Sequence, residues 1–296
     1  NTIYEKKFKL NIYFLGFVFL TAFLIVANNF FYWVSIKSFF EYSDWLINYQ
    51  AGFIRRGLIG EILYNIHNIS GIRLDYILFV FVFVTYAFFF LIIYRLITSI
   101  KLNFINTLII FSPLSFIYLA FTKTLAGRKE ILFFLLISIF FYKLKKIKFT
   151  EVKYWIIFIT IVSSLTHLGF IFYIPYLILF FIYLHPTKNL KEISIQVLPT
   201  LTVMFLILAC MLYSMMFTKI DLNIICDSIK SFTNECPEET YLAVFNLSIK
   251  DIKDINVEFS KNYYFIKYPI YYLISFFPIY LGFLNLKETK KYKVKR

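Results

Sequence analysis

The most regular feature of the chain is a series of apolar runs, each followed by a short polar segment. Several runs, such as residues 10–34 and 75–98, reach the roughly 20 residues that a helix needs to cross a bilayer. No small-residue cleavage site follows the first run, so we expect a retained helix rather than a signal peptide. The pattern predicts an all-α fold: a polytopic transmembrane helix bundle of about eight spans, forming a single integral membrane domain over residues 1–296.

The number of spans depends on residues 153–184. This stretch forms either one long tilted helix or two short helices broken at Thr166-His167-Leu168-Gly169. We favour the break, because it keeps the basic segments of the chain on one side of the membrane. The two halves are short for full spans, so we expect tilt, local thinning of the bilayer or a partly re-entrant pair.

Composition and charge indicate a membrane protein and argue against a nucleic-acid-binding one. Hydrophobic residues make up 60% of the chain, and its mean hydropathy of +0.72 is far from that of a soluble domain. With the N-terminus inside, the inner segments carry 18 of the 31 bases and four of the 17 acids, whereas charges balance in the outer segments. The net charge of +14 thus follows the positive-inside rule, and we expect the basic cytoplasmic tail 287–296 to rest on anionic lipid.

Two large polar excursions, outer loops at about 35–74 and 218–263, interrupt the apolar runs. In the first, apolar residues recur at helical spacing opposite Arg56 and Gly60, which predicts interfacial helices lying in the membrane plane. These apolar residues are Ile54, Leu58, Ile59, Ile62 and Leu63. In the second loop, mixed charge and Pro237 predict short helices that form a cap.

The cysteines fit this topology. Cys226 and Cys236 lie ten residues apart in the second outer loop, on the side where disulfides persist. We predict a structural disulfide between them rather than a metal site, because no histidine accompanies them. Cys210 lies within an apolar run and is predicted to pack against other helices.

The chain carries no motif of a soluble enzyme. A P-loop, a dinucleotide-binding glycine turn, Gly-x-Ser-x-Gly, His-Glu-x-x-His and paired Cys-x-x-Cys are all absent, which argues against a cytoplasmic ATP-driven transporter. Instead, three separate segments place polar residues on the outer side, as a lined pocket would require. They are Glu41, Asp44, Asn48, Arg55, Arg56 and Glu61; Lys123, Thr124, Arg128, Lys129 and Glu130; and Thr166 and His167.

Residues 50–61 point most directly to a ligand. Arg55 and Arg56 are costly beside lipid, so they need an anionic partner, a water-filled site or lipid headgroups. Gly52, Gly57 and Gly60 let backbone or ligand approach closely. We favour phosphate or diphosphate binding by the arginines, and snorkelling to lipid headgroups is the alternative.

The other candidates also have structural interpretations. The charged run 128–130 can flank the fourth span, and Asp44 can cap a neighbouring helix. His167 can satisfy backbone groups at the break, and Glu61 can pair with a nearby arginine. The common side that these residues share favours a joint role.

The chain resembles a class of enzymes of polysaccharide synthesis. The string Asn48-Tyr49-Gln50-Ala51-Gly52-Phe53-Ile54-Arg55-Arg56-Gly57-Leu58 resembles O-antigen and capsule polymerases of the Wzy type. A first span followed by an outer loop with an acidic residue, Asp44, is similar to GT-C-type membrane glycosyltransferases. Gly127-Arg128-Lys129-Glu130, and His167 followed by Phe170, Phe172 and Pro175, fit the same likeness. It covers residues 40–180, and Leu168 stands where such proteins often have an acidic residue.

The resemblance implies a glycosyltransferase or polysaccharide polymerase that uses a polyprenyl-(di)phosphate-linked sugar, such as one carried on undecaprenyl diphosphate. Its active site would face the periplasm, or outside, from a bacterial inner (cytoplasmic) membrane. Asp44 is implied as the catalytic base, with His167 as the alternative. The implied phosphate-binding residues are Arg55, Arg56, Arg128 and Lys129, supported by Asn48, Glu61 and Glu130. No cofactor and no metal is implied, although Glu41 and Asp44 can equally bind Mg²⁺ or Mn²⁺.

The expected partners are the lipid-linked glycan, the bilayer and other polysaccharide-assembly proteins, without nucleic acid. Three alternatives remain open. A single-sugar transferase would use the same site for one addition. A transporter or flippase of lipid-linked oligosaccharide would need the arginines but no base. An assembly or scaffold subunit would tolerate loss of all these side chains.

Overall fold

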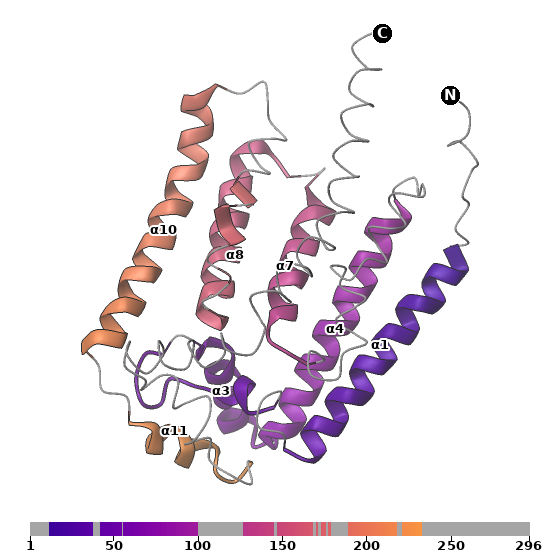
Figure 1. Ribbon diagram of the computed structural model, residues 1–296, viewed down its shortest axis with the longest axis vertical. Coiled ribbons are helices and arrows are strands. Elements are labelled where there is room, and N and C mark those ends of the chain that lie inside the picture. Colours follow the sequence, from indigo (N-terminus) through magenta and orange to yellow (C-terminus); the bar gives the residue numbers. More distant parts are fainter. Residues whose placement is uncertain are drawn as a thin grey trace, which may run out of the picture. The chain divides into compact units, whose positions relative to one another are not determined.

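The computed structural model describes residues 12–37, 42–54, 56–99, 127–144, 147–167, 170, 173–175, 177–178, 189–217 and 221–232 (Figure 1). Every regular element in these ranges is helical, and they contain no strand, so the predicted all-α class is confirmed for this part of the chain. The elements are α1 (Ile12–Ser35), α2 (Ser43–Leu46), α3 (Leu58–Ser70), α4 (Leu74–Thr98), α7 (Glu130–Lys143), the 3₁₀ turn η1 (Phe149–Glu151), α8 (Val152–Thr166), α10 (Leu190–Phe217) and α11 (Leu222–Ile229).

The chain divides into two compact units. Unit 1 comprises residues 1–28, 93–126 and 247–296, and unit 2 comprises residues 29–92 and 127–246. In unit 1, the first part of α1 buries Leu15, Phe19, Ala22 and Val26, which follow one another at helical spacing. The Phe19 ring meets the ring of Tyr94 edge to face, with 6.1 Å between their centroids.

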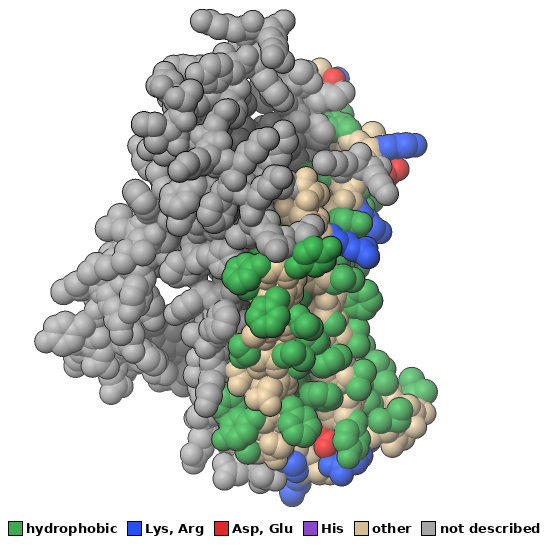
Figure 2. Space-filling model, turned by 90° about the vertical axis from the view of Figure 1, so that its right-hand side faces the viewer, with side chains coloured by type: hydrophobic (Ala, Val, Ile, Leu, Met, Phe, Trp, Pro, Cys, Tyr) green, Lys and Arg blue, Asp and Glu red, His purple; other side chains and the backbone are tan. Residues whose placement is uncertain are grey.

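Four helices of the described residues are long and apolar enough to cross a membrane. They are Tyr13–Ser35, Leu74–Thr98, Phe149–Thr166 and Lys191–Cys210. Large apolar side chains such as Tyr76, Val80 and Phe88 are exposed on α4, as expected for a helix that faces hydrocarbon. Figure 2 shows one face on which hydrophobic side chains cover much of the described surface. Lys and Arg side chains lie at both ends of this hydrophobic region. The described part of the chain is therefore helical and has four helices suited by length and composition to span a membrane.

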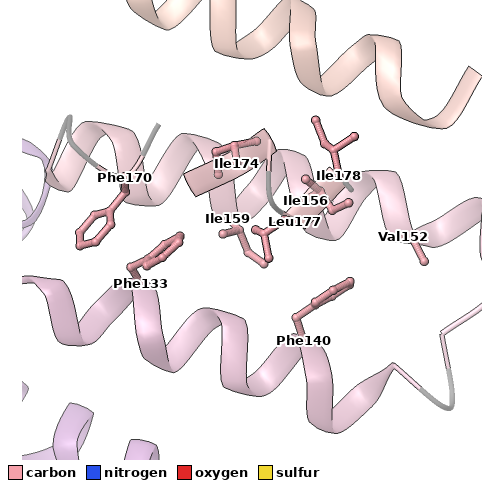
Figure 3. Close-up of a cluster of buried hydrophobic side chains, with 9 residues drawn as sticks. All are labelled: Phe133, Phe140, Val152, Ile156, Ile159, Phe170, Ile174, Leu177 and Ile178. Carbon is pink, nitrogen blue, oxygen red and sulfur yellow. The ribbon is translucent and has the colours of Figure 1, made fainter. Parts of the chain in front are cut away.

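Unit 2 is built around α8. Figure 1 shows α7, α8 and α10 side by side, and α8 packs against both neighbours. Between α7 and α8 lies a cluster of interdigitating apolar side chains (Figure 3). Its members are Phe133, Phe140, Val152, Ile156, Ile159, Phe170, Ile174, Leu177 and Ile178. Transfer of an apolar helix face from lipid tails to a protein interior changes its free energy little. Close van der Waals packing of this kind therefore holds α7 to α8.

The break predicted at residues 166–169 is confirmed. Helix α8 ends at Thr166, and His167 adopts an extended conformation with φ −155° and ψ 108°. The backbone N–H of His167 still donates to the carbonyl of Ser163 at 2.8 Å, so the last turn of the helix is closed. His167 thereby lies at the end of a helix that is anchored in the core of unit 2.

Helix α3 forms in the first outer loop, and Gly60 lies on its buried face. Ile59, Gly60 and Leu63 are buried, whereas Ile62 is exposed. The reason is a close crossing of the backbone, because a Cβ on Gly60 would lie 1.9 Å from the carbonyl oxygen of Ile47. Glycine, which has no Cβ, allows this close approach.

The second outer loop begins with a short helix, α11, as predicted. Its residue Ile225 packs with Ile47 and Ile54 of the first outer loop. Asn48 Nδ2 also donates to Ser228 Oγ at 2.8 Å. The first part of the second loop thus covers the first.

Two of the three cysteines lie in the described part of the chain. Cys226 is disulfide-bonded, and the partner predicted for it, Cys236, lies outside the described residues, as does Pro237. Cys210 is an exposed free thiol on α10, so the prediction that it packs against other helices was wrong.

Candidate functional site

The polar segments predicted to share one side meet at one end of unit 2. Figure 1 shows α3 and α11 at the same end as the first turns of α4 and α7 and the last turns of α8 and α10. An ion pair links the first outer loop to the start of α7, where Glu130 in turn faces His167 at the end of α8. These contacts bring Asp44, Arg56, Arg128, Lys129, Glu130 and His167 into one charged cluster.

Asp44 lies at the centre of the cluster. It sits in the first turn of α2, which shows no side-chain cap hydrogen bond, so its carboxylate does not cap that helix. Asp44 Oδ1 is 3.4 Å from Arg56 Nη1, and Oδ2 is 3.7 Å from Lys129 Nζ. Both carboxylate oxygens therefore face cations.

Lys129 immediately precedes α7 and is completely buried. Its ammonium group donates to the main-chain carbonyl of Arg56 at 3.0 Å, in addition to facing Asp44. A buried ammonium requires this kind of compensation, because the desolvation of an unpaired charge is very costly. Lys129 thus joins the start of α7 to the loop between α2 and α3.

A second ion pair, between Arg128 and Glu130, lies beside His167. Glu130 Oε1 lies 2.8 Å from Arg128 Nη2 and 3.9 Å from His167 Nε2. The Arg128 side chain is 42% exposed and that of Arg56 is 23% exposed, in contrast to Lys129. The two guanidinium groups are therefore the cations of the cluster that a ligand can reach.

Gly127, which directly precedes the charged residues 128–130, is held in place by its surroundings. Gly127 has φ +89°, and a Cβ there would lie 2.3 Å from the ring of Phe30, so only glycine fits. Its carbonyl accepts a hydrogen bond from the indole of Trp45, and its N–H donates to the hydroxyl of Tyr86 at 3.0 Å. Both partners are buried, so the start of α7 is held from two sides.

Burial and the neighbouring charges shift the pKa values of three residues in the cluster. Burial opposes ionisation of Asp44, but Lys129 and Arg56 outweigh it and hold the pKa of Asp44 below its ordinary value. Burial lowers the pKa of Lys129 to about 8, against the attraction of Asp44. Burial, followed by Arg56, lowers the pKa of His167, whereas Glu130 and Asp44 act in the opposite direction. Near pH 7, Asp44 is a carboxylate and His167 is a neutral imidazole.

The remaining predicted residues lie around this cluster or outside the described ranges. Asn48 is buried and bonds to α11. Glu61 accepts from the backbone N–H of Tyr49 at 2.9 Å and from the amide of Gln50 at 3.0 Å, so it braces the loop. Arg55, Glu41, Lys123 and Thr124 lie outside the described residues.

The contribution of Trp45 and Tyr86 was not predicted. Both appear in the sequence as ordinary aromatic residues of a membrane protein, and only the fold shows that they bond to Gly127. The burial of Lys129 was also missed, because a lysine between an arginine and a glutamate is typical of a solvated helix start. The signal that was available is the glycine before this run, which marks a special backbone conformation.

The chain matches no protein-family model, no curated protein and no solved structure. The chemistry of the site therefore has to be judged from its own residues. Within the described residues, no group of three His, Cys, Asp or Glu side chains is arranged to hold a metal ion. The cluster instead combines accessible guanidinium groups with a neutral imidazole, an arrangement suited to binding an anion beside a base.

Proposed function

We propose that this protein is a membrane glycosyltransferase of the polysaccharide polymerase type, acting on polyprenyl-(di)phosphate-linked sugars. The observation that carries the proposal is the charged cluster at one end of unit 2, where Arg128 and His167 both face Glu130 and the charge of Arg56 acts on His167. Three bases against two acids give this cluster a net positive charge, which favours a polyanionic ligand such as a diphosphate.

In the proposed reaction, the hydroxyl oxygen of the acceptor sugar attacks the anomeric carbon of the donor sugar. The bond from that carbon to the lipid (di)phosphate breaks, and the (di)phosphate leaves with the electron pair. The hydroxyl proton passes to a base. Arg56 and Arg128 stabilise the charge that develops on the leaving group, since guanidinium groups match phosphate oxygens.

His167 is the better candidate for the base, although Asp44 led on sequence grounds. A base works best when its pKa lies near the working pH, and the lowered pKa of His167 leaves the imidazole neutral at pH 7. Asp44 faces two cations that lower its pKa and weaken it as a base. We assign Asp44 the role of holding Arg56.

The same cations argue against Asp44 as a metal ligand. A divalent ion at this carboxylate would lie close to the charges of Arg56 and Lys129, and like charges repel strongly where they are partly buried. The proposed leaving-group stabilisation therefore relies on guanidinium groups rather than on Mg²⁺ or Mn²⁺.

The proposal includes a membrane arrangement. The protein would have about eight spans in a bacterial inner membrane, with α3 lying in the interface plane and the charged cluster facing the periplasm. Basic segments on the opposite side support this orientation through the positive-inside rule. Lipid-linked glycan and other polysaccharide-assembly proteins are the proposed partners.

The test is complementation of a deletion strain of the organism that encodes the chain. Surface polysaccharide is profiled by gel for wild type, Arg56→Ala, His167→Gln and Arg73→Ala, with protein levels measured in the membrane. Arg73 is the matched control, because it also pairs with an aspartate, Asp75 at 2.7 Å, but is 61% exposed and lies outside the cluster. We expect single repeat units from the deletion, and a long-chain ladder restored by wild type and Arg73→Ala only.

The alternatives give other patterns. If His167→Gln restores the ladder and Arg56→Ala does not, the site binds phosphate without transferring sugar, as a transporter or flippase would. If every variant restores it, the cluster has no catalytic or binding role and a scaffold function follows. If the deletion strain adds one sugar fewer but keeps its chain length, the protein is a single-sugar transferase.

A further inference from the structure

The buried ammonium group of Lys129 has a role different from that of the arginines beside it. Lys129 has no exposed side-chain surface, whereas Arg56 and Arg128 retain 23% and 42%. A ligand at the surface of the cluster would meet the arginines first. Contact with the Lys129 ammonium would require the loop between α2 and α3, which carries Arg56, to move.

The contacts of Lys129 connect two segments that are far apart in the sequence. Its Nζ donates to the main-chain carbonyl of Arg56 at 3.0 Å and lies 3.7 Å from Asp44 Oδ2. Asp44 Oδ1 in turn lies 3.4 Å from the guanidinium of Arg56. Arg56 is thus held at both ends, at its backbone by Lys129 and at its side chain by Asp44.

We propose that Lys129 is a positioning residue that fixes Arg56 for binding of the diphosphate and does not itself touch the ligand. The identity of the ligand rests on the proposed function, whereas the positioning role rests on the contacts described above. Trp45 and Tyr86 support it, because they fix Gly127 and so set where Lys129 enters the cluster.

The charges of the pair provide a way to test this role. Removal of Lys129 alone leaves the partly buried carboxylate of Asp44 with one partner fewer, and removal of Asp44 alone leaves a buried ammonium without its carboxylate. Removal of both charges together avoids each of these penalties. In an Asp44→Asn variant, the side-chain carbonyl can still accept from Arg56, so the position of the guanidinium is retained.

The experiment is a double-mutant cycle on the full chain in lipid nanodiscs, comparing wild type, Lys129→Met, Asp44→Asn and the double variant. Thermal stability is measured together with equilibrium binding of undecaprenyl diphosphate, and undecaprenol serves as the phosphate-free control. We expect Lys129→Met to lower Tm and to weaken binding by about tenfold. We expect the double variant to recover most of the lost Tm and most of the lost affinity.

Two results would overturn the positioning role. Lys129→Met that weakens binding at an unchanged Tm, with no recovery in the double variant, would identify Lys129 as a direct ligand contact. Lys129→Met with wild-type Tm and affinity would show that the buried pair fixes nothing. Wild-type protein that binds undecaprenol as well as undecaprenyl diphosphate would instead overturn the proposed function, while the Tm cycle would still decide whether Lys129 and Asp44 depend on each other.

Discussion

His167 is subject to two opposing electrostatic influences that can be separated by mutation. Burial, followed by the charge of Arg56, lowers its pKa, and the carboxylate of Glu130 raises it. Loss of Glu130 should therefore favour the neutral imidazole further, whereas loss of the Arg56 charge should favour the imidazolium. A histidine remote from both charges would respond to neither change.

We expect the pKa of His167 to fall in Glu130→Gln and to rise in Arg56→Gln. The measurement is an NMR titration of protein with ¹⁵N-labelled histidine, in which the His167 signals are assigned by their loss in His167→Gln. The signals of the other two histidines are the control within each spectrum. Shifts in the same direction for both variants would show that a change of packing, rather than charge, dominates.

Sequence patterns predicted which residues belong to the cluster better than what each residue contacts. Residues of the first outer loop, of the charged run 128–130 and of the break were identified because charges in an apolar chain are conspicuous. Their pairing could not be predicted, because Asp44 and Lys129 lie 85 positions apart and no local rule connects them. Burial inverted the expected roles: Lys129 was predicted to bind phosphate, but its ammonium faces Asp44 and the Arg56 carbonyl.

At the scale of elements, the crossing of the first outer loop over α3 depends on one missing side chain. A Cβ on Gly60 would lie 1.9 Å from the Ile47 carbonyl oxygen and 2.6 Å from its carbon, so the backbone itself would have to shift. We expect Gly60→Ala to destabilise the protein by roughly 2–4 kcal/mol, more than its gain in helix propensity can offset. Thermal unfolding in detergent measures this change.

A matched substitution controls for the general effect of replacing a glycine in a helix. Gly16 lies in α1, and a Cβ there would be 3.6 Å from the nearest atom of Tyr94, an ordinary contact. Gly16→Ala should therefore leave Tm unchanged or raise it slightly. Equal losses of Tm in the two variants would contradict the close crossing at Gly60.

The long helices were predictable, whereas the short ones depended on tertiary contacts. Runs such as residues 10–34 and 75–98 correspond to α1 and α4 within two residues, because uniform hydrophobicity alone specifies a membrane helix. The crossing at Gly60 was predicted only as a close approach of backbone or ligand, because periodicity does not specify which segment lies over the glycine. Glycine positions carry packing information that periodicity does not include.

At the scale of the whole molecule, the orientation in the membrane can be tested with two positions of unit 2. Ser70 ends α3 and Lys148 precedes η1 and α8, and both are exposed. The last turns of α8 lie at the end of unit 2 where α3 packs, and its first turn follows Lys148. If α8 crosses the membrane, Ser70 and Lys148 lie on opposite sides of it.

We expect Ser70→Cys, in a Cys210→Ala background, to react with a membrane-impermeant maleimide in intact spheroplasts. We expect Lys148→Cys to react only after the membrane is opened, because the positive-inside rule places the basic segment 143–153 in the cytoplasm. The Cys210→Ala protein alone gives the background, since Cys226 is disulfide-bonded. Labelling of both cysteines in intact spheroplasts would show that α8 does not cross. Labelling of Lys148→Cys alone would show the opposite orientation, with the charged cluster in the cytoplasm. A periplasmic polymerase could not use a site on that side.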